Sequence, residues 1–149
     1  MGRRRKEKQI IGKTDFADFP VFGLSDVAVK IDSGAYTSTI DCLKIEEKND
    51  LLEVVFLRKT NKSFTGEKKI FDKYSVKRVR SSSGESQLRF TVKGTILLFD
   101  QIYKTEFTLS KRKKMRYPVL LGRKLLNKHF LIDTSLKDVS IKLKNKNTE

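Results

Sequence analysis

The sequence predicts an all-β protein, a small closed β-barrel with one short C-terminal helix. Apolar and polar residues alternate in short runs, and turn-forming residues separate these runs from one another. Only residues 123–128 show a convincing helical pattern. Many short strands joined by turns favour a barrel over an α/β fold, because an α/β fold needs a helix between successive strands.

The chain is long enough for one domain with its own core, and it shows neither an internal repeat nor a domain boundary. We therefore expect a single folded domain over residues 9–143. Residues 1–8, Met-Gly-Arg-Arg-Arg-Lys-Glu-Lys, are predicted to be a disordered basic arm, either an electrostatic anchor or a solvated tail. Residues 144–149 are predicted to be a disordered tail.

The expected elements follow one another closely along the chain. Two strands at 9–11 and 27–31 flank a loop or hairpin over residues 14–24, and Asn49-Asp50 forms a turn. Gly94 is expected to divide two strands. The remaining strands are predicted at 39–45, 51–57, 71–79, 88–92, 95–99, 102–109, 118–121, 130–132 and 139–143.

The charge of the chain is its outlying property. Lys and Arg number 33 against 18 Asp and Glu, which gives a net charge of +15. Such a field favours acidic partners, namely nucleic acid, an anionic membrane surface or an acidic polypeptide. Cys42 is the only cysteine, so no disulfide framework is expected and a reducing, cytoplasmic location is favoured. No apolar run is long enough for membrane insertion.

One carboxylate stands out, at the end of the apolar strand 27–31. The strand runs directly into Asp32, and an ionised Asp at the end of a buried strand loses solvation unless something binds it. Gly34 allows a sharp turn and Ala35 keeps crowding low. The pattern is typical of a loop that holds one carboxylate out toward a cleft.

The sequence Ile-Asp-Ser-Gly-Ala at 31–35 resembles the active-site loop of retroviral-type aspartic proteases. Residues 119–126, Val-Leu-Leu-Gly-Arg-Lys-Leu-Leu, resemble the second motif of that family, at a suitable separation for one protomer. Together with residues 10–12, 79–82, 115–118 and 130–133, these motifs are similar to a retropepsin-like family long labelled "ATP-dependent zinc protease". Members of that family are often found beside a ligase that adds glutamates to proteins. The resemblance covers roughly residues 9–137.

This resemblance implies a retropepsin-like barrel whose active site lies at a two-fold homodimer interface. Because the chain has one Asp-Ser-Gly loop, each subunit would contribute Asp32 to a dyad that activates water and protonates the leaving nitrogen. Ser33 would hydrogen-bond to the partner loop, and Gly34 would admit the substrate backbone. The predicted function is hydrolysis of peptide bonds in acidic or polyglutamylated protein segments.

The candidate substrate-binding residues lie in the same loop, in a predicted flap over residues 80–89 and in the second motif. Retroviral enzymes carry an acidic residue where this chain has Tyr36, so the arginine of the second motif must find another acceptor or face the substrate. Arginine side chains bind carboxylates in bidentate fashion, which suits an acidic substrate. The predicted set comprises Ala35, Thr37, Arg80, Ser81, Ser82, Arg89, Arg116 and Arg123.

No metal site and no cofactor are expected. His129 and Cys42 are the only strong zinc ligands, they lie on distant segments, and a catalytic zinc usually takes three protein ligands. No phosphate-binding loop ending in Gly-Lys-Ser/Thr supports ATP binding.

Two other interpretations remain open from the sequence. The first is a catalytically inactive barrel that binds an acidic protein tail. The second is a nucleic-acid binder, although the basic residues are spread over many segments and Trp is absent. Association with the ribosome would also account for the positive charge without base recognition.

Overall fold

The computed structural model describes residues 7–80, 84–111 and 116–147. Six strands close into a barrel in the order β10, β3, β2, β8, β9, β4, because β4 pairs back onto β10. This confirms the predicted all-β closed barrel. Its strands are β2 (Thr14–Phe19), β3 (Leu24–Ile31), β4 (Ser38–Lys48), β8 (Ser86–Leu98), β9 (Gln101–Ser110) and β10 (Val119–Leu121).

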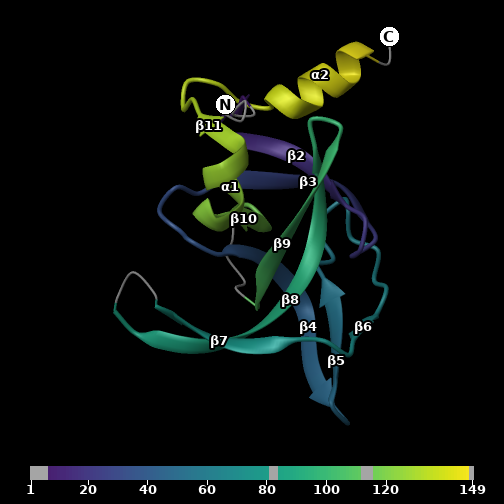
Figure 1. Ribbon diagram of the computed structural model, residues 1–149. Helices are drawn as coiled ribbons and strands as arrows, with labels where there is room; N and C mark the ends of the chain where they lie inside the picture. Colours follow the sequence, from purple (N-terminus) through teal and green to yellow (C-terminus); the bar gives the residue numbers. More distant parts are fainter. Residues whose placement is uncertain (1–6, 81–83, 112–115, 148–149) are drawn as a thin grey trace, which may run out of the picture.

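The other elements extend from this barrel (Figure 1). β5 (Leu51–Phe56) and β6 (Lys69–Phe71) continue the sheet beyond β4, and β7 (Ser75–Arg80) pairs with the first half of β8. β7 and this part of β8 form an arm that projects from the barrel toward the side where the β3–β4 loop lies, at the left of Figure 1. β1 (Gln9–Ile11) and β11 (Phe130–Ile132) form a separate parallel pair.

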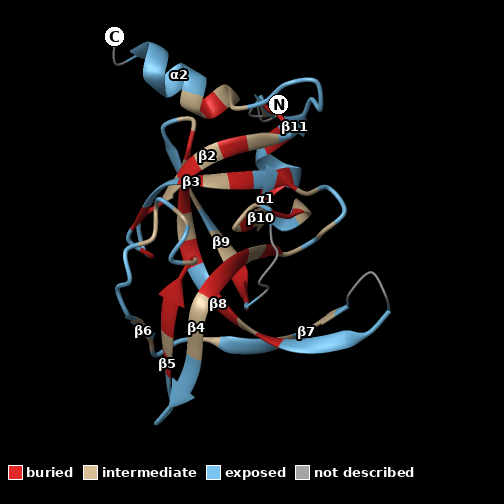
Figure 2. Ribbon diagram, turned by 180° about the vertical axis from the view of Figure 1, so that it is seen from behind, coloured by how far each residue is buried: buried red, intermediate tan, exposed pale blue. Residues whose placement is uncertain are grey.

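The core fills the barrel with aliphatic and phenylalanine side chains, and Figure 2 shows the buried positions concentrated there. Along β3, Val27, Val29 and Ile31 point inward while Lys30 is exposed, which is the period expected of a strand with one buried face. The ring of Phe22 lies 4.3 Å from that of Phe56 and 5.5 Å from that of Phe107, measured between centroids. The aromatic cluster thus ties the β2–β3 turn to β5 and β9.

Gly94 does not divide two strands, contrary to the sequence prediction. β8 runs unbroken from Ser86 to Leu98, and Gly94 makes room for a core side chain. A Cβ atom at Gly94 would lie 2.5 Å from Cζ of Phe22. The strand ends instead at Phe99 and Asp100, whose positive φ angles of 52° and 59° suit the tight turn of a β-hairpin.

Two further expectations need correction, and one is confirmed. The loop expected over residues 14–24 contains strand β2, and the single strand expected over 71–79 is split between β6 and β7. The turn at Asn49 and Asp50 is present, with φ angles of 53° and 60°.

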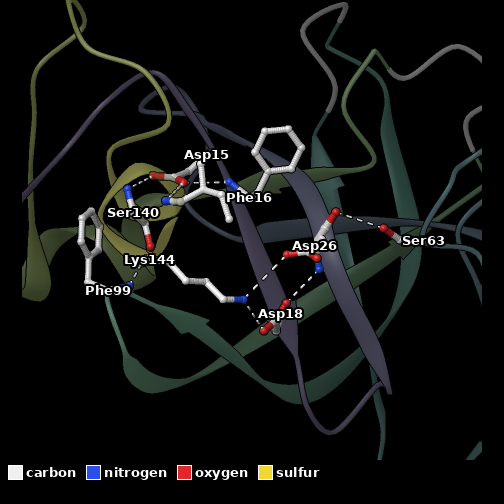
Figure 3. Close-up of polar contacts among 9 residues, drawn as sticks. Asp15, Phe16, Asp18, Asp26, Ser63, Phe99, Ser140 and Lys144 are labelled. Atoms are coloured by element: carbon white, nitrogen blue, oxygen red, sulfur yellow. Dashed lines mark hydrogen bonds and ion pairs between the residues drawn. The ribbon is translucent and has the colours of Figure 1, made fainter. Parts of the chain in front are cut away.

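The segment from Val139 is helical, where a strand over 139–143 and a disordered tail over 144–149 were expected. α1 (Arg123–His129) is the predicted helix, and α2 (Val139–Asn147) is a second one. The alternation of Val139, Ile141 and Leu143 suits a strand, but the helix is specified by a residue distant in sequence. Figure 3 shows the buried Asp15 of β2 at the helix start.

Asp15 acts as a long-range cap of α2. Its carboxylate accepts hydrogen bonds from the backbone N–H groups of Ser140 and Ile141, at 2.8 and 3.1 Å. Burial raises the pKa of Asp15, and the backbone donors lower it in part. Lys144 lies 3.8 Å from Asp18 and 3.9 Å from Asp26, so a second contact holds α2 to the barrel (Figure 3).

The predicted arm over residues 1–8 falls largely outside the described residues. Within the described ranges, no helix has the length and apolar character needed to cross a membrane.

We predict that Gly94→Ala destabilises the fold by about 1–3 kcal/mol, because the added methyl group overpacks the core against Phe22. Urea unfolding followed by circular dichroism measures the change. The neighbouring exposed Lys93→Ala is the control and should have little effect. In the background Phe22→Leu, the same glycine substitution should be much less harmful; an equal loss in both backgrounds would contradict the packing argument.

Candidate active site

Asp32 lies at the carboxyl end of β3, immediately after the last buried residue of that strand. β10 runs parallel to β3 with Leu121 opposite Ile31, and the backbone N–H of Asp32 donates to the Leu121 carbonyl at 2.9 Å. The second sequence motif is therefore the direct neighbour of the first, as the resemblance implied.

The loop after β3 presents the Asp32 carboxylate at the surface. Asp32 is half-buried, whereas Ser33 and Gly34 are exposed. The Gly34 N–H donates to Oδ1 of Asp32 at 3.0 Å, and the Ala35 N–H donates to the Asp32 carbonyl at 3.2 Å. A Cβ atom at Gly34 would lie 3.3 Å from that same carboxylate oxygen, so glycine allows the loop to close tightly around it.

The N-terminal end of helix α1 contacts the backbone of the Asp32 loop. The N–H groups of Arg123 and Lys124 donate to the carbonyls of Ala35 and Tyr36, both at 2.9 Å. These contacts satisfy donors that have no partner within the helix. The contact is too close for a side chain at Gly122, since a Cβ atom there would lie 2.5 Å from the Tyr36 carbonyl oxygen.

Arg123 finds its acceptor within the same loop. Its guanidinium donates to the Ser33 carbonyl at 2.9 Å and lies 5.8 Å from the centre of the Tyr36 ring. Tyr36 thus replaces the expected acidic partner with a cation–π contact. Asp32, Ser33, Gly34, Ala35 and Arg123 are brought together in one hydrogen-bonded unit.

The remaining predicted substrate-binding residues are more widely distributed. Thr37 is half-buried and follows the loop, Arg80 is exposed at the end of β7, and Arg116 is exposed with its guanidinium 5.9 Å from the Tyr117 ring centre. Arg89 is buried in β8, with a nitrogen 3.5 Å from the side-chain oxygen of Gln87. Ser81 and Ser82 lie outside the described residues. The roles of all these residues in binding substrate stay predictions.

Two supporting residues were not found from the sequence. The buried Ser38 accepts a hydrogen bond from the Gly122 N–H at 3.0 Å, which fixes the glycine under the loop. Glu106 of β9 binds Lys77 of the projecting arm at 2.6 Å and Lys124 of α1 at 2.5 Å. These hydrogen bonds, chiefly the one from Lys124, lower the pKa of Glu106 to about 2. Only the position of Ser38 in a run of hydroxyl residues hinted at such a role.

In the part of the chain that the structure describes, no three His, Cys, Asp or Glu side chains lie close enough together to hold a metal ion. Cys42 is fully buried, and burial raises the pKa of its thiol, which disfavours the thiolate that would bind a metal. His129 lies at the end of α1, against the ring of Tyr103 at 4.8 Å.

A family model described as "Retropepsin-like aspartic endopeptidase RimB" matches residues 10–143 of the chain. The chain belongs to this RimB-like family. The assignment agrees with the closed barrel, with Asp32 at the end of β3 and with the pairing of β10 beside β3. It supports an aspartic-peptidase type of site.

Curated relatives of this RimB-like chain carry a different name. A "Probable alpha-L-glutamate ligase" of Desulfotalea psychrophila is 32% identical over 136 residues, and one of Shewanella pealeana is 32% identical over 135 residues. The matches cover 87% and 86% of this chain but only 29% of each relative. The chain therefore corresponds to less than a third of those proteins.

Among solved structures, a crystal structure of protein Lpg0085, of unknown function, from Legionella pneumophila has a similar fold. Its TM-score is 0.68 at 24% identity, and the match covers 90% of this RimB-like chain and 99% of that one. The likeness concerns the fold alone.

We predict that Glu106→Gln lowers stability by about 1–2 kcal/mol at neutral pH, since two partly exposed ion pairs are lost. The folded-state pKa lies below the ordinary value of 4.5, so this stabilisation is present above pH 4.5 and disappears as the pH falls toward 2. Urea titrations across this range should show the two proteins converging in acid. A difference that persists at pH 2 would contradict the assignment.

Proposed function

We propose that the protein is an aspartic peptidase whose catalytic dyad is formed by Asp32 from two copies of the chain. The observation that carries the proposal is the Asp32 loop itself. It presents a carboxylate at the surface, and β10 and α1 hold it through backbone hydrogen bonds. Membership of the RimB-like family supports this use of the loop.

A two-fold dimer is needed because the chain supplies one Asp-Ser-Gly loop. An exposed apolar pair supports such an interface: Ile10 of β1 and Leu131 of β11 are in register, and their exposed fractions are 47% and 55%. Apolar side chains that gather at a surface mark interaction sites. β11 directly follows α1, so this pair lies on the element next to the helix that braces the loop.

In the dimer, two carboxylates about 3 Å apart would share one proton, because both cannot ionise easily at that separation. The ionised Asp32 takes a proton from water, which attacks the peptide carbonyl carbon. The protonated Asp32 gives its proton to the carbonyl oxygen, which yields a tetrahedral diol. The other Asp32 then passes the proton it took from water to the leaving nitrogen as the C–N bond breaks, and a diol hydroxyl returns a proton to the first carboxylate. Ser33, exposed beside the carboxylate, would bond to the partner loop and fix the relative orientation of the two acids.

For the substrate, we propose an acidic or glutamate-rich polypeptide. The net charge of +15 favours an acidic partner, and the relatives named as probable glutamate ligases point to glutamate chains in particular. We further propose that the substrate is cytoplasmic, at or near the ribosome, because a free, buried cysteine suits a reducing compartment.

We predict that Asp32→Asn lowers cleavage of a glutamate-tailed peptide by at least about a thousandfold, because the amide cannot accept the proton of water. Mass spectrometry of the products measures the rate. Circular dichroism and analytical ultracentrifugation should show an unchanged fold and dimer. A chelator should leave the wild-type rate unaltered.

The matched control is Asp72→Asn, an exposed aspartate on the loop after β6, which should retain full activity. Equal activity of Asp32→Asn and wild type would reject the dyad. If neither protein cleaves the peptide and both bind it equally, the inactive acidic-tail binder is favoured instead.

A further inference from the structure

A concave surface lies next to the loop that carries Asp32, along the β8–β9 hairpin. This groove has a volume of about 650 Å³, within the range of ligand sites. Strand residues from β8 and β9 line one side, and α1 lines the other. Tyr36, two residues beyond Gly34, also lines it, so the groove begins at the Asp32 loop.

The charges that line this groove are mainly positive. Lys93 and Lys104 come from the hairpin, and Lys124 and Lys128 come from successive turns of α1. Glu106 is the one acidic residue in the lining. Four lysines against one glutamate leave an excess of three positive charges, with His129 taken as neutral.

Glu106 is already used within the fold. Both of its oxygens are bound, one by Lys77 and the other by Lys124. Within the described part of the chain, Lys93, Lys104 and Lys128 have no ion-pair partner. Three lysines without a carboxylate partner thus line one concave surface, and an anionic ligand would reduce the repulsion among their charges.

We propose that this lysine groove binds the carboxylates of an acidic polypeptide that extends from the candidate active site. Tyr36 is four residues after Asp32 and lies in the groove lining, so the groove borders the loop that carries the carboxylate and is placed to receive a chain bound there. Lysines supply mobile point charges, which suit a run of flexible carboxylates. The groove lacks arginine, the residue that matches phosphate with a bidentate fork, and Tyr36 is the one Phe, Tyr or Trp in its lining, so the observations favour an acidic peptide over nucleic acid.

The inference deepens the proposed function by naming where acidic substrate residues lie, and it is tested without turnover. Binding of fluorescein-labelled hexaglutamate to Asp32→Asn protein is measured by anisotropy at fixed low ionic strength. The triple substitution Lys93→Gln, Lys104→Gln, Lys128→Gln should weaken binding by about tenfold or more. The matched control, Lys59→Gln, Lys62→Gln, Lys142→Gln, removes the same charge at exposed sites outside the groove and should change affinity less than about twofold.

Equal losses in the two triple variants would overturn the groove, because they would show a response to net charge alone. The groove would also be rejected as a peptide site if the triple groove variant kept its affinity for hexaglutamate but lost binding to a single-stranded oligonucleotide. A wild type that binds the peptide in the groove but does not cleave it would reject the peptidase and leave the groove standing. If the wild type cleaves the peptide and the groove variant binds it as tightly as before, the peptidase proposal stands and the groove is rejected.

Discussion

The position of β10 between β3 and β4 is the constraint on which the barrel and the site both depend. β10 is only three residues long, yet it pairs in parallel with β3 and in antiparallel with β4, and this second pairing closes the barrel. The same strand brings the Leu121 carbonyl to the Asp32 N–H. Because α1 begins directly after Gly122, closing the barrel also places the helix under the loop. Core formation and presentation of the carboxylate are therefore one structural event.

Several acidic residues of the chain are committed to structure. Asp15 caps α2, the buried Asp41 binds Arg58 through two hydrogen bonds of 2.9 and 3.1 Å, and Glu106 joins two lysines. Asp15 accepts from backbone N–H groups at a buried helix start, whereas Asp41 and Glu106 accept from cationic side chains that remain partly exposed. The excess of lysine and arginine is then left at the surface, where it generates a field toward solvent. The net charge of +15 attracts an anionic partner to such a surface.

The barrel and the Asp32 loop could be predicted from the sequence because their determinants are local. Alternation of Val27, Val29 and Ile31 defines β3, and Asp-Ser-Gly-Ala follows it directly. Two of the failures occurred where a contact distant in sequence decides the local structure. Gly94 breaks strand propensity but leaves space for Phe22, and the alternating residues after Val139 become helical because Asp15 binds the first turn. Neither partner can be inferred from the neighbouring residues.

The same distinction explains the candidate site. The arginine of the second motif was visible in the sequence, but its acceptor was not, because a backbone carbonyl leaves no trace in the residue types. The lysines of the groove were individually indistinguishable from those of any solvated strand or helix. Only the pairing of β8 with β9 and the packing of α1 beside β9 bring Lys93, Lys104 and Lys128 to one concave surface. Composition fixes how much positive charge the chain carries, but topology decides where that charge becomes dense enough to recognise a ligand.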